Sequence, residues 1–196
     1  MSLQSRFQAA FSESIELKRR VLQDLGPLVT AAAEMLAQVF KSGGRVLIFG
    51  NGGSAADAQH LAAEFVNRFQ IERPPLAALA LTTDTSILTA VGNDYDFTEI
   101  FAKQVRALGK PGDLAWGIST SGNSPNVVAG LKTAREMGLK TLALSGKDGG
   151  PVAAAADMAL TVPSPITPRV QEVHITIGHV LCDLVDYLLF PEKFGG

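Results

Sequence analysis

The sequence predicts a doubly wound α/β fold in which a five-stranded parallel sheet follows two N-terminal helices. Five short apolar runs lie between residues 46 and 162, and helical stretches separate them. Continuous apolar runs are typical of strands covered on both faces, and their alternation with helices favours parallel βαβ units. The length of 196 residues is about 1.3 times a typical domain, and the chain carries no repeat or linker. We therefore expect one domain over residues 1–196.

The first 42 residues are expected to form the two leading helices. An apolar residue recurs every three to four positions from Leu3 to Leu25, and a second such stripe runs from Pro27 to Phe40 before Gly43 and Gly44. These helices have little sheet beside them to cover, so we expect residues 1–42 to pack against another subunit. The α/β core then occupies residues 45–196.

The strands and helices of the core can be placed from the same patterns. The expected strands are Val46–Phe49, Leu76–Ala80, Leu114–Ile118, Thr141–Leu144 and Met158–Val162. The expected helices are Ser54–Phe69, Ser86–Val91 with Phe97–Leu108, Pro125–Met137 and Pro168–Leu189, and the segment Gly146–Gly150 is expected to be a turn. Ligands of such sheets bind beyond the carboxyl ends of the strands, so functional residues are expected in the loops that follow them.

Composition excludes several classes of protein. Seventeen basic and nineteen acidic side chains give a net charge of −2, which disfavours direct nucleic-acid binding. The single cysteine, Cys182, excludes an intramolecular disulfide or a multi-cysteine metal site and fits a reducing compartment. The sequence has no run of ~18 apolar residues and no signal-peptide pattern. We expect a cytoplasmic protein that does not interact with membranes.

The loop after the first strand satisfies a dinucleotide-binding pattern. Gly50–Ala55 reads Gly-Asn-Gly-Gly-Ser-Ala and opens a helix, as in G-x-G-x-x-G/A. The second strand, however, ends in Thr82-Thr83 and lacks the acidic residue that holds a ribose. The sequence therefore disfavours a nicotinamide or flavin site.

The loop after the third strand is the stronger signal. Residues 119–125 read Ser-Thr-Ser-Gly-Asn-Ser-Pro, with Ser124 expected as the N-cap and Pro125 as the first residue of the next helix. A helix N-terminus with neighbouring hydroxyl donors is suited to a phosphate monoester. The alternative is a serine-rich turn with an ordinary helix cap.

Polar residues on two helices suggest a metal site. His60 and Glu64 are four residues apart, so both project from one face and can bind one divalent metal, or simply hydrogen-bond to each other. Gln171 and His179 are separated by roughly 12 Å along the last helix and turned by about 80°. One small site using both therefore needs side chains stretched toward each other, or a second chain that supplies one of them.

Other polar residues have simpler interpretations. Asp57 is expected to be an acid in the first turn of a helix, where the helix dipole favours a negative charge. His174 fits a packed or surface histidine, and Cys182 fits a small buried apolar residue. Asn93 and Asp94 either hydrogen-bond a polyhydroxylated ligand or turn the chain.

Taken together, these motifs resemble the sugar isomerase (SIS) domain family, whose fold is flavodoxin-like, and within it the phosphoheptose isomerases. The resemblance covers nearly the whole chain. The residues that carry it are Gly50–His60 with Glu64, Leu81–Thr85, Gly92–Asp94, Ser119–Ser124, and Arg169–His174 with His179.

The resemblance implies a site between the subunits of a homotetramer. It assigns the phosphate to Ser119, Thr120, Ser121 and Ser124, and the rest of the substrate to Asn51, Gly52, Gly53, Glu64, Asn93, Asp94 and Gln171. It assigns one zinc ion per subunit to His60, Glu64, Gln171 and His179. Glu64 would then be the catalytic base and His179 its partner acid or base.

The implied reaction converts sedoheptulose 7-phosphate to D-glycero-D-manno-heptose 7-phosphate through an enediol, toward the heptose of bacterial surface lipopolysaccharide. The alternative is a non-catalytic SIS adaptor that binds the replication initiator, because that branch resembles Ala102–Gly109 and Leu181–Leu184. Its members lack the acid and histidine present here as Glu64 and His179. These two residues therefore favour the enzyme.

Overall fold

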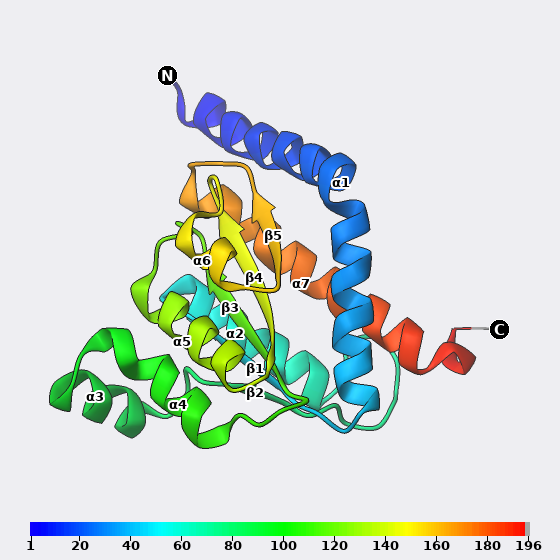
Figure 1. The fold of residues 1–196 in the computed structure, drawn as a ribbon. Helices are drawn as coiled ribbons and strands as arrows, with labels where there is room; N and C mark the ends of the chain where they lie inside the picture. Colours follow the sequence, from blue (N-terminus) through cyan, green and yellow to red (C-terminus); the bar gives the residue numbers. More distant parts are fainter. Residues whose placement is uncertain (195–196) are drawn as a thin grey trace.

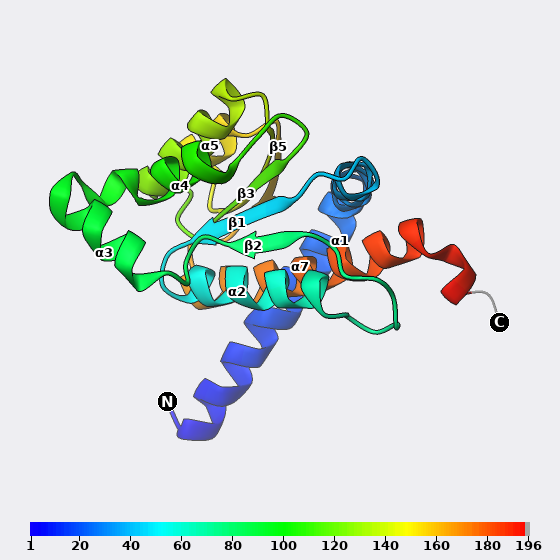
Figure 2. The same cartoon turned by 90° about the horizontal axis from the view of Figure 1, so that it is seen from below.

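Five parallel strands form the centre of the molecule in a computed structural model that describes residues 1–194 (Figures 1 and 2). The strands are β1 (Val46–Gly50), β2 (Ala78–Ala80), β3 (Leu114–Ser119), β4 (Lys140–Gly146) and β5 (Met158–Val162). Their order in the sheet is β2-β1-β3-β4-β5. The predicted doubly wound α/β fold is therefore confirmed.

Helices cover both faces of this sheet. Within residues 1–194 they are α1 (Leu3–Lys41), α2 (Gly53–Val66), α3 (Thr85–Asp94), α4 (Ile100–Leu108), α5 (Pro125–Glu136), α6 (Gly150–Ala155) and α7 (Thr167–Leu189). Figure 2 shows α2 and α7 on one side of the sheet and α4 and α5 on the other. α3 extends outward beside α4, beyond the edge of the sheet.

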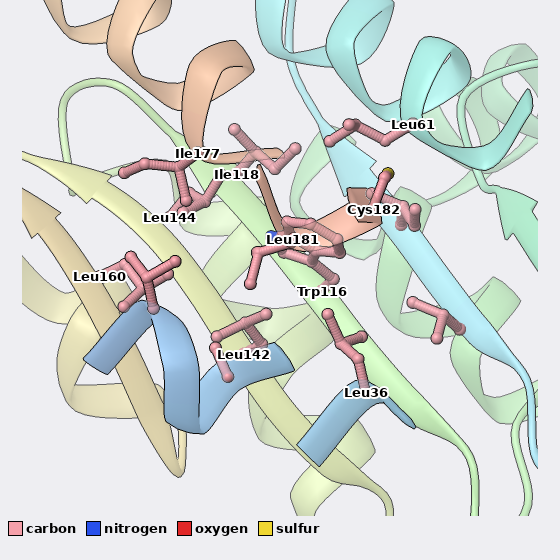
Figure 3. Close-up of a cluster of buried hydrophobic side chains, with 14 of the residues drawn as sticks. Leu36, Leu61, Trp116, Ile118, Leu142, Leu144, Leu160, Ile177, Leu181 and Cys182 are labelled. Atoms are coloured by element: carbon pink, nitrogen blue, oxygen red, sulfur yellow. The ribbon is translucent and has the colours of Figure 1, made fainter. Parts of the chain in front are cut away.

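Successive side chains of each strand point to opposite faces of the sheet, so the hydrophobic core consists of two clusters, one on each face. Trp116 and Ile118 of β3 face the α1, α2 and α7 side, whereas Ala115 faces the α4 and α5 side. Trp116 is fully buried and lies close to Leu181 of α7, with Leu36 of α1 nearby (Figure 3). Because both faces of β1 and β3 are covered, their sequences are nearly continuous apolar runs.

The two leading helices expected from the sequence are one continuous helix, α1. Pro27 lies inside it, and Figure 1 shows α1 bending sharply midway along its length. Proline has no N–H to donate to the preceding turn, and its ring crowds that turn, so it bends a helix without ending it. The Thr30 hydroxyl donates to the Gly26 carbonyl at 3.1 Å, a bond that also accompanies bends. The sequence located the bend correctly but predicted a break.

Several further elements differ from expectation. α2 ends at Val66 and not at Phe69, and the segment expected as one helix over Phe97–Leu108 is a 3-10 turn, Phe97–Glu99, followed by α4. The second strand begins at Ala78 and not at Leu76, because Pro74 and Pro75 precede it and only Val46–Ile48 of β1 pair with it. The segment Gly146–Gly150 contains the expected turn, but Gly150 also begins the short helix α6. Among residues 1–194, no helix is both long and apolar enough to cross a membrane.

The parallel register brings the functional loops to one edge of the sheet. Gly50 at the end of β1 pairs with Ile118, and Ser119 at the end of β3 pairs with Ser145. The loops that follow β1, β3 and β4 therefore leave the sheet side by side. This edge is where a ligand of a doubly wound sheet is expected.

Candidate functional site

Three side chains of types that can bind a metal meet where α2 lies against α7. Nε2 of His60 is 2.8 Å from Nε2 of His179 and 3.3 Å from Oε1 of Glu64. One ligand atom from each of the three residues lies within 4.8 Å of the others. The His60 side chain is 46% exposed and that of Glu64 21%, so a solvent-borne ligand can reach the cluster.

The packing of α2 on α7 produces this meeting. Gly53 near the start of α2 contacts Gln171 near the start of α7, and Leu61 further along α2 contacts Gly178 further along α7. The two helices therefore run in the same direction. A Cβ atom at Gly178 would lie 2.6 Å from Leu61 Cδ2, so the glycine permits a close approach. His179 is the next residue, and its ring also stacks on Phe69. The approach of the helices therefore places His179 against His60.

Gln171 reaches the same helix nearer its start. A Cβ atom at Gly53 would lie 2.3 Å from Gln171 Nε2, so the glutamine side chain rests directly on this glycine. The long separation of Gln171 and His179 along α7 is thus matched by the separation of Gly53 and His60 along α2. Both side chains reach α2 within one chain, and a second chain is not needed for this.

Asp57 lies near this cluster and feels the charges of His60 and His179, although the sequence suggested only a role at the helix dipole. It is buried, and its Oδ2 has no hydrogen-bond partner among the described residues. Burial raises the pKa of Asp57, while a hydrogen bond from Gln171 and the charges of His60 and His179 oppose that rise. The positions 57, 60 and 64 share one helical face, and this spacing was the signal in the sequence that could have identified Asp57.

The donor set is compatible with a divalent metal. An imidazole nitrogen carries either one hydrogen or one lone pair, so His60 Nε2 cannot satisfy both His179 and Glu64 by itself. A cation among the three atoms would accept a lone pair from each of them. Two imidazole nitrogens and a carboxylate oxygen are ligands typical of catalytic zinc. The cluster of His60, Glu64 and His179 is therefore a possible metal site.

The hydroxyl-rich loop after β3 forms a compact group. Ser119 Oγ lies 2.8 Å from Ser124 Oγ and 3.3 Å from Ser121 Oγ, with Thr120 partly buried beside them. Ser124 is the N-cap residue of α5, as predicted, but its hydroxyl bonds to Ser119 and does not cap the helix. Gly122 has a φ of +71°, a value that glycine adopts without strain, and this permits the turn.

The loop after β1 is tied to this hydroxyl loop by two amides. Asn51 Nδ2 donates to Asn126 Oδ1 and Asn126 Nδ2 donates to Asn51 Oδ1, each at 2.8 Å. Asn126 is the second residue of α5 and is buried. Gly52, with a φ of +55°, then turns the chain into Gly53 and α2. Asn51 therefore couples the start of α2 to the start of α5.

Asn93 and Asp94 lie apart from these groups. They end α3, are exposed, and Asn93 Nδ2 donates to Asp94 Oδ1 at 2.9 Å. Neither belongs to the group formed by His60, Glu64 and His179, and the hydrogen bond between them is local. Their assignment to the substrate stays a prediction.

His174 is a core residue, as the sequence suggested. It is fully buried, and its Nε2 lies 3.0 Å from the carbonyl oxygen of Ser145 on β4. Burial lowers the pKa of His174 to about 4, although the hydrogen bond to Ser145 opposes this change. The residue is therefore neutral at pH 7.

The doubly wound α/β sheet, with a hydroxyl loop and a His–Glu–His cluster at the carboxyl edge of its strands, defines a class of fold that binds ligands at this edge, and comparisons with known proteins identify the family. Residues 11–146 match the family model described as SIS domain. A phosphoheptose isomerase from Nitratidesulfovibrio vulgaris (strain Miyazaki F) is 58% identical over 181 residues, which cover 92% of this chain and 87% of the relative.

Two solved structures agree with this match. The phosphoheptose isomerase of Neisseria gonorrhoeae is 50% identical with a TM-score of 0.90, covering 94% of this chain and 99% of the other. That of Francisella tularensis is 40% identical with a TM-score of 0.91, covering 95% and 99%. The chain therefore belongs to the SIS domain family and, within it, groups with the phosphoheptose isomerases.

The buried His174 should make stability depend on pH. Its pKa is about 4 in the folded protein and about 6.5 when unfolded, so only the unfolded state takes up a proton between these values. Stability should fall by about 3 kcal/mol as pH drops from 6.5 to 4. Urea unfolding at fixed protein concentration across this range would measure the loss, and His174→Leu should remove most of the dependence. An equally steep dependence in the variant would contradict this assignment.

Proposed function

We propose that this protein is an aldose–ketose isomerase that interconverts sedoheptulose 7-phosphate and D-glycero-D-manno-heptose 7-phosphate. The observation that carries the proposal is the convergence of His60, Glu64 and His179 beside α2. The relatives named phosphoheptose isomerase support the choice of substrate. The comparisons do not support the alternative of a non-catalytic adaptor for the replication initiator.

The hydroxyl loop is suited to the phosphate end of the substrate. Ser119, Ser121 and Ser124 already face one another, and the first turn of α5 follows directly. Hydroxyl donors and a helix N-terminus stabilise phosphate oxygens without a fixed positive side chain. We assign the phosphate to Ser119, Thr120, Ser121 and Ser124, with Asn51, Gly52 and Gly53 lining the path from this loop to Glu64.

The isomerisation needs a group that moves a proton between carbon atoms. In the ketose-to-aldose direction, Glu64 takes a proton from C1 and the oxygen at C2 is protonated, which gives the enediol. The hydroxyl at C1 then loses its proton and C2 gains one, which gives the aldose. His179 lies beside Glu64 and is suited to exchange protons with the two oxygens.

We propose that the cluster holds zinc, with Gln171 as an additional ligand beside His60, Glu64 and His179. Zinc at this position would polarise the substrate carbonyl and stabilise negative charge on its oxygen. Glu64 has two carboxylate oxygens, so it can contact a metal and still accept a proton. Gln171 rests on Gly53 and hydrogen-bonds to Asp57, which supports its place at the edge of the cluster.

We propose that four copies assemble through the N-terminal half of α1. Leu3, Phe7, Phe11, Ile15 and Leu22 form an apolar stripe there, and all five are exposed within one chain. An apolar stripe of this size usually marks a contact with another protein. The homotetramer and the cytoplasmic location expected from the sequence stay predictions.

Proton nuclear magnetic resonance in heavy water tests the function directly. With sedoheptulose 7-phosphate as substrate, the aldose should appear with deuterium at C2, because the proton that Glu64 takes from C1 exchanges with heavy water before a proton is returned to C2. Chelator-treated protein should lose this activity, and zinc alone should restore it. Binding of the sugar without formation of aldose or exchange, in zinc-loaded protein, would contradict the isomerase.

Glu64→Gln tests the catalytic base. The amide keeps the size of the side chain but cannot accept the proton, so kcat should fall roughly 100- to 10,000-fold. Glu72→Gln is the matched control, because Glu72 is an exposed glutamate outside the cluster and should leave kcat unchanged. Initial rates of aldose formation would measure both. Normal turnover by Glu64→Gln would exclude Glu64 as the base.

Native mass tests the assembly. Sedimentation equilibrium should give four times the 20.7 kDa chain mass, and replacing Phe7 and Phe11 together with serine should shift the distribution toward smaller species. The aromatic pair packs with a ring separation of 4.6 Å and is exposed, so its loss should affect association more than folding. A wild-type monomer at micromolar concentration would refute the tetramer.

A further inference from the structure

A buried ion pair joins the end of α2 to α7. Nε of Arg73, in the loop after α2, donates to Oδ1 of Asp186 on α7 at 2.8 Å. Their side chains are 0% and 2% exposed. Taking two charges out of water is costly, so such a pair contributes little to stability unless further hydrogen bonds are made.

The further hydrogen bonds of Arg73 go to the last turn of α2. Nη2 donates to the carbonyl oxygen of Glu64 at 2.9 Å and Nη1 to that of Phe65 at 2.6 Å. Longer contacts of 3.3 Å reach the carbonyls of Asn67 and Pro74. The last carbonyls of a helix have no hydrogen-bond donor within the helix, and they carry partial negative charge. The guanidinium of Arg73 supplies both the missing donors and a positive charge.

This arrangement links the two proton-transfer residues through the backbone. The carbonyl bound by Nη2 belongs to Glu64 itself. Asp186 lies seven residues after His179, which places it about 10 Å further along α7 and within about 20° of the same face. The ion pair therefore connects the turn that carries Glu64 to the face that carries His179.

We propose that Arg73 and Asp186 are positioning residues that fix Glu64 relative to His179. The inference rests on the proposed function, in which Glu64 takes a proton from the substrate. A shift of about 1 Å in a catalytic group can lower a rate by two orders of magnitude. The bonds from Arg73 to the Glu64 and Phe65 carbonyls also stabilise the end of α2, so the tests must separate an effect on turnover from an effect on stability.

A second ion pair provides a matched control. Asp113 is buried, and its Oδ2 lies 3.2 Å from Nε of Arg45. It also accepts from the backbone N–H groups of Arg45 and Lys110. Arg45 and Asp113 immediately precede β1 and β3, at the opposite edge of the sheet from the catalytic cluster. Asp113→Asn thus disturbs a buried charge away from the site.

The first test compares Asp186→Asn with Asp113→Asn. Asp186→Asn should lower kcat roughly 10- to 100-fold. Its KM should stay within about twofold of the wild-type value, because the phosphate loop is unchanged. Asp113→Asn should lower the melting temperature but leave kcat within about twofold of wild type. Equal kcat values for the two folded variants would overturn the inference.

The second test removes both charges together. The double variant Arg73→Met with Asp186→Leu should fold, because no unpaired charge remains buried, yet its kcat should stay low because the carbonyls of Glu64 and Phe65 lose their donor. Zinc affinity, measured by calorimetry without substrate, should fall roughly tenfold or more as the ligand positions relax. Wild-type kcat and zinc affinity in this variant would overturn the inference. Failure of every variant to fold would assign the pair to folding and would overturn it as well.

The activity of the wild-type protein distinguishes a failure of this inference from a failure of the proposed function. Wild-type protein that forms no aldose contradicts the isomerase. A normal wild type beside a normal Asp186→Asn variant contradicts only the positioning role.

Discussion

The close parallel packing of α2 on α7 is the contact on which the site depends. Two glycines permit it, because Gly178 admits Leu61 and Gly53 admits Gln171 at distances that a Cβ atom would prevent. The side chains of His60, Glu64 and His179 then meet without any unusual backbone conformation in either helix. This cluster is thus a product of helix packing, whereas the hydroxyl loop after β3 is a product of strand and turn geometry.

Hydrogen bonds and an ion pair fix the position of the His60–Glu64–His179 cluster relative to the hydroxyl loop after β3. The reciprocal amide bonds of Asn51 and Asn126 join the start of α2 to the start of α5, and Arg73 joins the end of α2 to α7. α2 is consequently fixed at both ends by polar contacts, partly buried at Asn51 and fully buried at Arg73, while one of its faces stays open to ligands.

The sequence predicted the fold well because the apolar runs of buried parallel strands are a strong pattern. The same apolar periodicity could not distinguish a bend at Pro27 from a break, since proline permits both outcomes. Spacing along one helix identified His60 with Glu64. It could not show that Gln171 reaches Gly53 while His179 reaches His60, about two turns further along α2. Nor could it show that Asp57 is buried between these positions. Both facts depend on the packing of α2 against α7, which are far apart in the sequence.

The bend in α1 has a consequence for assembly. The second half of α1 is packed into the core through Leu36, so the direction in which the first half extends is fixed before any partner is met. The first half of α1 therefore has little conformational freedom to lose on association. More of the free energy of its apolar contacts is then available for binding. The angle set at Pro27 would also determine the relative orientation of associating copies. One residue remote from the sheet edge can thereby govern the quaternary geometry.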